Sequence, residues 1–231
     1  MKDFSIFEKK LNLNFKNKDL LIQAFVHRSF LNENPDFNLG HNERLEFLGD
    51  AVLSFVVSTW LFKEFPQFFE GKLTSLRSNL VKTTSLTKVA QKLKVGDYLL
   101  LSKGEKESQG QQNPTLLANA MEAIIGAIFL DQGVKVAKDF IEIHFEPLLK
   151  EIMISGKLKD YKSLLQEKIQ AQTSQSPVYK IIKEEGPEHN KIFTVSVAAE
   201  GEILATGVEK SKQKAEEEAA KQALEKLTSK K

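Results

Sequence analysis

The segment NERLEFLGDAV, residues 42–52, carries three acidic side chains among apolar ones. Glu43, Glu46 and Asp50 follow one another at intervals of three and four residues, so on a helix they share one narrow stripe. Ionised carboxylates this close repel one another, and they are costly to bury without a positive partner. Arg44 is the nearest cation in the sequence, but it would lie on a different side of the helix. Another positive group must therefore compensate the acids.

A second apolar segment, LLANAMEAIIGAIFL at residues 116–130, contains a matching polar pair. Asn119 and Glu122 are its only residues with polar side chains, and they lie on one face of what should be a buried helix. If the two helices pack across each other, the two polar stripes can converge on one point. Carboxylate and amide oxygens suit Mg²⁺ or Mn²⁺ rather than zinc. The spacing thus predicts a divalent-cation site formed by Glu46, Asp50, Asn119 and Glu122.

The helix dipole offers a simpler explanation for two of these acids. Glu43 and Glu46 lie in or just after the first turn of the predicted helix, where the dipole favours negative charge. It does not explain Asp50, which lies two turns along and is surrounded by apolar residues. Spacing alone leaves a metal site and a structural set of acids equally open.

Other kinds of catalytic site find no support in the sequence. The four histidines are scattered and no pair has the spacing of metal ligands, so each is expected to be structural or on the surface. The chain has no cysteine, and hence no disulfide framework and no thiolate zinc site. No nucleophile elbow, phosphate-binding glycine loop or dinucleotide fingerprint is present.

The composition is that of a globular protein of 231 residues, 41% of them hydrophobic. The first 12 residues contain no apolar core segment of a signal peptide, and no run approaches about 18 apolar residues, so we expect a cytoplasmic protein without a membrane partner. The net charge is +2, and residues 157–231 account for it with 14 lysines against 12 acidic residues. This excess favours a polyanionic partner for the C-terminal third.

Hydrophobic periodicity divides the chain into two domains. Residues 1–152 should be nearly all helical, and residues 153–159 are typical of a short polar linker. The helical spacing of apolar residues marks the segments 20–31, 43–65, 72–94, 114–130 and 135–152. The sequence between 103 and 114 is typical of a loop.

Residues 160–229 predict a small α+β domain with the order α-β-β-β-α. A helix over 160–172 would turn Leu164, Leu165 and Ile169 inward. Three alternating segments then read as strands, and an alanine-rich helix over 211–228 closes the domain. The fold class is therefore an all-α domain followed by a small α+β domain.

The motif HNERLEFLGDAVL, residues 41–53, closely resembles the signature of the ribonuclease III family. Further similar segments are AFVHRSF (24–30), EGKLTSLRSNLV (70–81) and LLANAMEAIIGAIFLDQG (116–133). The C-terminal part resembles a double-stranded-RNA-binding domain in DYKSLLQEKIQ (160–170), GPEHNKIFTV (186–195) and GVEKSKQKAEEEAAKQAL (207–224). Together these segments cover nearly the whole chain in the order found in bacterial ribonuclease III, an endonuclease domain followed by an RNA-binding domain.

The resemblance implies a homodimer, joined through the helical domain, that hydrolyses both strands of double-stranded RNA. The products would carry 5′-phosphate and 3′-hydroxyl ends with a short 3′ overhang, and the substrates would include ribosomal RNA precursors and structured messenger RNAs. Mg²⁺, with Mn²⁺ as a possible substitute, would activate water for attack on the phosphodiester. The family's metal ligands correspond to Glu46, Asp50, Asn119 and Glu122. Asp50 and Glu122 would be catalytic, with Glu43 and Glu70 as supporting acids.

Position 119 departs from the family pattern, in which we expect Asp. Asn119 keeps a carbonyl oxygen that can bind a cation or one of its waters, but it lacks the negative charge. We therefore expect weaker metal binding rather than loss of activity.

The RNA-binding domain of the family reads the shape of A-form RNA through 2′-hydroxyls and phosphates. The matching residues here are Ser163, Gln166, Glu167, Pro187, His189, Lys210, Lys212 and Lys214. The alternative for the lysines is an ordinary solvated face. The match is also imperfect, because Ser211 is followed by Lys212 and Gln213 where two lysines are usual, and Glu209 stands where glycine is common.

Two other functions stay open at this stage. One is a non-catalytic double-stranded-RNA-binding protein on the same fold, with Asn119 as a sign of decay. The other is metal-dependent hydrolysis of small phosphate esters. The first alternative is disfavoured because the chain retains all five acids of the family pattern, Glu43, Glu46, Asp50, Glu70 and Glu122. The C-terminal domain argues against the second alternative.

Overall fold

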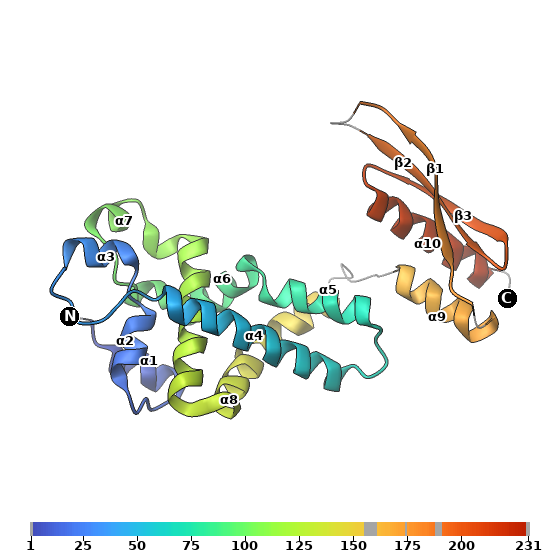
Figure 1. Cartoon of the computed structure of the whole chain (residues 1–231). Coiled ribbons are helices and arrows are strands. Elements are labelled where there is room, and N and C mark those ends of the chain that lie inside the picture. The colour runs from blue at the N-terminus through green and yellow to red at the C-terminus, as the bar shows by residue number, and fades with distance from the viewer. Residues whose placement is uncertain (1, 155–160, 174, 188–190, 230–231) are drawn as a thin grey trace. The chain divides into compact units, whose positions relative to one another are not determined.

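The computed structural model describes residues 2–154, 161–173, 175–187 and 191–229. The chain splits into two compact units, Met1–Lys157 and Leu158–Lys231. Figure 1 shows helices throughout the described part of the first unit, and a three-stranded sheet with two helices in the second. This architecture confirms the predicted fold class.

The first unit consists of eight α-helices and two short 3₁₀ turns within the described residues. These are α1 (Phe4–Leu11), α2 (Lys18–Ala24), α3 (Arg28–Glu33), α4 (Glu43–Glu64), α5 (Glu70–Val81), α6 (Thr83–Lys92), η1 (Val95–Tyr98), α7 (Lys103–Glu107), η2 (Gly110–Gln112) and α8 (Pro114–Ile154). Non-helical backbone at Gly133, with φ of 82°, bends α8 between the two helices predicted for this region. The predicted loop over 103–114 instead contains α7 and η2.

The helix predicted over 20–31 is interrupted by a contact with a distant part of the chain. The N–H of Leu100 donates to the carbonyl of Phe25 at 2.8 Å, and the N–H of His27 donates to the carbonyl of Leu100 at 3.0 Å. These bonds pair Val26 with Leu100 and leave His27 extended, so α2 ends and α3 begins on either side. The helix predicted over 72–94 is likewise two helices, because Lys82 is extended.

Helices α4 and α8 form the centre of the unit and touch through their backbones. A Cβ atom at Gly49 would lie 1.8 Å from the carbonyl oxygen of Glu122, and one at Gly126 would lie 2.3 Å from that of Leu45. Only glycine fits at such distances. The crossing is sealed by fully buried apolar side chains, among them Leu53, Val57, Met121, Ile124, Ile125 and Ile128.

Although no long run of this chain is wholly apolar, α4 and α8 are each long and apolar enough to cross a membrane by length and composition. The larger share of the most apolar part of α8 is buried inside the helical unit. Burial against a protein core accounts for such composition, because a helix that is apolar nearly all round has no solvent face.

The second unit has the order α9 (Tyr161–Thr173), β1 (Val178–Glu185), β2 (Ile192–Ala199), β3 (Glu202–Glu209) and α10 (Lys212–Ser229). The strands pair antiparallel in the order β1-β2-β3. Its core contains Leu165, Ile169, Val197, Ala205, Ala219, Ala220 and Ala223. Small residues are needed where α10 crosses β3, since a Cβ at Gly207 would lie 2.2 Å from the carbonyl oxygen of Ala215.

Leu164 does not turn inward as predicted, because 40% of its surface is exposed. Leu165 and Ile169 are four residues apart and share one helical stripe, and both are buried. Leu164 lies about 100° around the helix from Leu165 and falls outside that stripe.

The glycine contact predicts a large cost for adding one methyl group. We expect Gly49→Ala to lower the free energy of unfolding by about 2–3 kcal/mol, because α4 and α8 must move apart to admit the Cβ. Urea denaturation followed by circular dichroism measures this change.

Gly104 on α7 is the matched control, since a Cβ there meets no atom within 4 Å. Gly104→Ala should change stability by less than about 1 kcal/mol. Equal effects of the two substitutions would contradict the close backbone contact.

Candidate active site

The crossing of α4 and α8 brings the polar stripes of the two helices together. Burial is the main reason that the pKa of Glu122 is raised to about 7, and the nearby charges of Asp50 and Glu46 raise it further. The pKa of Glu46 is also raised, by burial and then by Glu43, while a hydrogen bond from Asn119 partly opposes this rise. Glu46, Asp50, Asn119 and Glu122 therefore lie near enough to influence one another's charge, while the cation site predicted from their spacing stays a prediction.

The carboxylate oxygens of this cluster do not surround a single point. Among the described residues, no three His, Cys, Asp or Glu side chains are close enough together to hold a metal ion. The donor set fits a hard divalent cation in chemistry, since it consists of carboxylate and amide oxygens.

Glu43 lies at the edge of this cluster. Its carboxylate is 4.0 Å from Arg28 and 3.7 Å from Nδ1 of His41. Glu70 is the first residue of α5 and accepts a hydrogen bond from Thr74 at 2.8 Å. None of the contacts described for Glu70 joins it to the other acids, so within one chain the structure does not bring it into the cluster.

A cavity of about 320 Å³ adjoins the acids. It is lined by His27, Arg28, Asn42, Glu43, Glu46, Leu99, Leu101, Leu116 and Asn119. Sequence reasoning assigned no role to His27 or Arg28, although both belong to the segment AFVHRSF that carries part of the family resemblance. It also passed over Gly49 and Gly126, whose signal is the presence of glycine inside two otherwise apolar helices.

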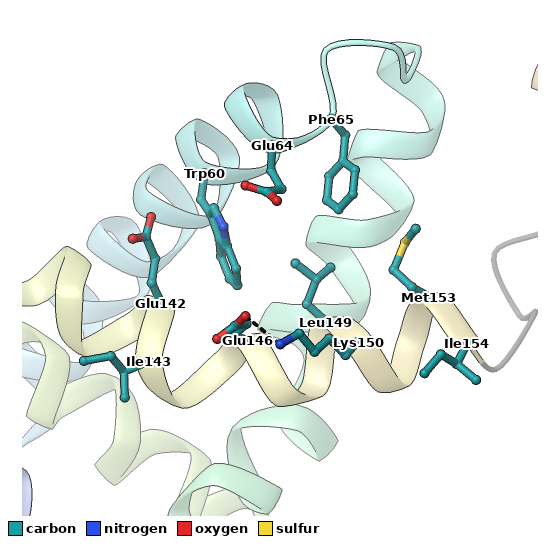
Figure 2. Close-up of a pocket in the computed structure, with 10 residues that line it drawn as sticks. All are labelled: Trp60, Glu64, Phe65, Glu142, Ile143, Glu146, Leu149, Lys150, Met153 and Ile154. Carbon is teal, nitrogen blue, oxygen red and sulfur yellow. Dashed lines mark ion pairs between the residues drawn. The ribbon is translucent and has the colours of Figure 1, made fainter.

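A larger cavity, of about 480 Å³, lies between the end of α4 and the last turns of α8 (Figure 2). Trp60, Phe65, Leu149 and Met153 contribute apolar surface to it. Two of its carboxylates are already paired, Glu142 with Lys138 at 2.9 Å and Glu146 with Lys150 at 2.7 Å. Glu64 is the third carboxylate of this lining, so the paired acids leave this cavity with less unpaired negative charge than the acid cluster has.

The lysines predicted to contact RNA are exposed at the start of α10. Lys210, Lys212 and Lys214 surround Ser211, whose side chain accepts a hydrogen bond from the N–H of Lys214. Lys212 lies 3.6 Å from Glu184 near the end of β1, so part of its charge is offset. This contact places the start of α10 beside the end of the sheet where β1 finishes.

The other predicted RNA contacts lie on α9 and after β1. Ser163, Gln166 and Glu167 are partly exposed on α9, and Pro187 is exposed after β1. An ion pair of Lys162 with Glu216 joins the start of α9 to the first turns of α10, so these segments gather at one end of the unit. His189 lies outside the described residues.

The chain thus joins a helical unit that carries an acid cluster to an α-β-β-β-α unit that exposes lysines. Residues 17–149 match the family model described as ribonuclease-III-like, and residues 161–227 match the double-stranded RNA binding motif. The chain belongs to the ribonuclease III family and is an endoribonuclease of that family.

Individual relatives agree along nearly the whole chain. Ribonuclease 3 of Dehalococcoides mccartyi is 44% identical over 225 residues, which cover 97% of this chain and 95% of that protein. The nuclease domain of ribonuclease III from Campylobacter jejuni is 42% identical, with a TM-score of 0.58 over 63% of this chain and 97% of that chain. Dicer from Pichia stipitis is 28% identical, with a TM-score of 0.50 over 92% of this chain and 95% of that chain.

The raised pKa of Glu122 predicts a pH-dependent weakness of the metal-free protein. Between about pH 4.5 and 7 the folded chain keeps a proton that the unfolded chain has released, so stability falls as the pH rises through this window. In EDTA at pH 8, Glu122→Gln should be more stable than the original chain by about 1–2 kcal/mol, after allowance for solvent screening. Urea titrations at pH 5 and pH 8 measure the difference, which should shrink at pH 5.

Glu107→Gln provides the control for this measurement, because Glu107 is exposed on α7. It should leave the pH dependence of stability unchanged. A stability gain from Glu122→Gln that is the same at both pH values would contradict the electrostatic explanation.

The lysines at the start of α10 predict a measurable salt effect. Changing Lys210, Lys212 and Lys214 to alanine should weaken duplex RNA binding and reduce the salt slope of log K by about two to three. Filter binding at several salt concentrations measures the slope. Lys183→Ala is a matched control on β1, where the lysine is paired with Glu185, and an unchanged slope in the triple variant would remove these lysines from the RNA interface.

Proposed function

We propose that this chain is a Mg²⁺-dependent endoribonuclease, also able to use Mn²⁺, that hydrolyses both strands of double-stranded RNA. It would leave 5′-phosphate and 3′-hydroxyl ends with a short 3′ overhang. In this proposal the endonuclease domain spans residues 1–152, the linker 153–159 and the RNA-binding domain 160–229. The observation that carries it is the gathering of Glu46, Asp50 and Glu122, none of which forms an ion pair among the described residues.

The bound cation would supply positive charge that activates water and stabilises the charge that develops on the phosphate. The side chains of the cluster prepare the site for it. Asn119 lies beside Glu46 and partly offsets the rise in the pKa of that carboxyl group, and its amide oxygen would be available as a further ligand. Burial and the charges of Asp50 and Glu46 raise the pKa of Glu122 to about 7, so a bound cation would stabilise the ionised form of this carboxyl group. Asp50 and Glu122 are the residues that we assign to catalysis, and Glu43 and Glu70 support them.

A homodimer joined through the helical domain would place two such sites on one duplex. The support is a stripe of exposed phenylalanines on α4. Phe47, Phe55 and Phe62 are 81%, 60% and 72% exposed, and helical geometry places them within about 80° of one another. Large apolar side chains grouped in this way mark surfaces that are covered by a partner. Each protomer would then supply one site, and each site would cut one strand of the duplex.

The RNA-binding domain supplies affinity without base specificity in this proposal. The exposed lysines of α10 and the side chains of α9 gather at one end of that unit, as contact with successive grooves of a duplex requires. Structured ribosomal RNA precursors and messenger RNA hairpins are the proposed substrates, and the cytoplasm is the proposed location.

Cleavage of an end-labelled RNA duplex tests the whole proposal. We expect cutting with Mg²⁺, no cutting with EDTA, and at least about a 100-fold slower reaction for Glu122→Gln with Mg²⁺. The products should be staggered and should carry 5′-phosphates. Such ends can be relabelled only after treatment with phosphatase, and this requirement would detect them.

Asn119→Asp tests in the same assay whether Asn119 only weakens metal binding or marks the loss of the metal site. Adding a carboxylate should lower the Mg²⁺ concentration needed for half-maximal cleavage, because Asn119 lacks the charge that the family pattern supplies. Binding of duplex RNA without cutting in every condition would instead favour a non-catalytic RNA-binding protein, in which Asn119 marks the loss of the metal site.

A further inference from the structure

His27 is held in one orientation between α2 and α3. Its Nδ1 atom accepts the backbone N–H of Ser29 at 3.3 Å and lies 2.8 Å from the hydroxyl of the same residue. The Ser29 hydroxyl oxygen in turn accepts the backbone N–H of Ser102 at 3.1 Å. These contacts fix the imidazole ring by one of its two nitrogens.

The hydrogen-bond network also assigns the tautomer of His27. A backbone N–H can only donate, so Nδ1 of His27 is an acceptor and the proton of the neutral ring belongs on Nε2. Burial lowers the pKa of His27; Glu105 and Glu43 act in the opposite direction, while Arg28 and His41 lower it further. At neutral pH the ring therefore offers a fixed Nε2–H donor, and no hydrogen bond from this atom is found among the described residues.

The cavity beside the acids has two chemically different walls. His27 and Arg28 contribute hydrogen-bond donors, whereas Glu46 and Asn119 contribute oxygens of the proposed cation site. The remaining lining consists of Leu99, Leu101, Leu116, Asn42 and Glu43. The Glu43 carboxylate is 4.0 Å from Arg28 and offsets part of its charge. A ligand that satisfies both walls must be an anion with several oxygens, one directed to the cation and another to the N–H donors. A phosphate group has this character.

We propose that the cavity seats a backbone phosphate of the RNA strand being cut, with Nε2–H of His27 donating to a non-bridging oxygen and Arg28 adding positive charge. This assignment rests on the proposed nuclease function and adds a substrate-contacting residue to it. The phosphate lies next to the acid cluster, so His27 sets the position of the strand relative to the reacting bond. Histidine was expected from the sequence to be structural or on the surface, and the proposal revises that expectation.

Capping α3 does not by itself explain a histidine at this position. The cap uses only Nδ1, and Ser, Thr, Asp and Asn are the residues that perform this task best. Histidine differs from them by carrying a second nitrogen about 2 Å further from the backbone. That second nitrogen belongs to a side chain that lines the cavity.

His27→Asn and His27→Gln separate the two nitrogens. The asparagine oxygen can take the place of Nδ1 and keep the cap, but no atom remains at the position of Nε2. The glutamine amide reaches about as far as Nε2 and can restore the donor. We expect His27→Asn to slow single-turnover cleavage with saturating Mg²⁺ by about 10- to 100-fold. His27→Gln should recover part of this loss, and melting temperatures should stay within a few degrees of the original chain.

Sulfur substitution in the RNA tests the contact itself. Duplexes carrying single phosphorothioates around the cleavage site should contain one position at which sulfur slows the original enzyme, and this loss should disappear in His27→Asn. The affinity of His27→Asn for the duplex, measured with Ca²⁺ in place of Mg²⁺, should differ from that of the original chain by less than about threefold. One neutral hydrogen bond adds little to the total affinity.

Arg28→Ala gives a second variant that should fold normally, since the Arg28 side chain is 74% exposed and its contact with Glu43 is a surface pair. It should slow cleavage by about 3- to 10-fold and reduce the same phosphorothioate effect. Full activity of His27→Asn beside an active original enzyme would overturn this proposal and leave the proposed function intact. Failure of the original enzyme to cut with Mg²⁺ would overturn both.

Discussion

The contact of α4 with α8 through Gly49 and Gly126 is the constraint on which the helical unit depends. Backbones that touch bring side chains on both flanks of the crossing into one small volume. On one flank these side chains are apolar and stabilise the core. On the other they are Glu46, Asp50 and Glu122, whose charges oppose one another. The same contact therefore stabilises the fold and concentrates the strain that a cation would relieve, a trade-off expected at functional sites.

Much of this arrangement follows from the sequence. The apolar spacing identified the long helices, the alternation identified the strands, and the i, i+3 and i+4 spacing of the acids predicted their shared face. The stripes of α4 and α8 could be predicted to meet because each interrupts an otherwise apolar stretch, residues 45–57 in α4 and 116–130 in α8. Leu164 was misplaced since two adjacent residues cannot share a helical stripe, and the alanines of α10 were placed correctly since they recur at helical intervals.

Other features depend on contacts between distant residues and could not be predicted. The break between α2 and α3 is caused by backbone hydrogen bonds to Leu100, which lies far along the chain. That break creates the turn in which His27 is fixed, so no periodicity points to the histidine. Glu70 matches the family pattern by sequence, yet it begins a different helix and has no described contact with the other acids.

Trp60 is the only tryptophan of the chain, and it lines the cavity between the end of α4 and the last turns of α8 (Figure 2). The carboxylates of Glu64, Glu142 and Glu146 line the same cavity, and α8 ends at Ile154, after which the chain continues toward the second unit. The long-wavelength emission of the whole protein thus arises from one indole in the helical unit. Its spectrum reports the polarity of that cavity alone, which makes the protein its own optical probe without any label.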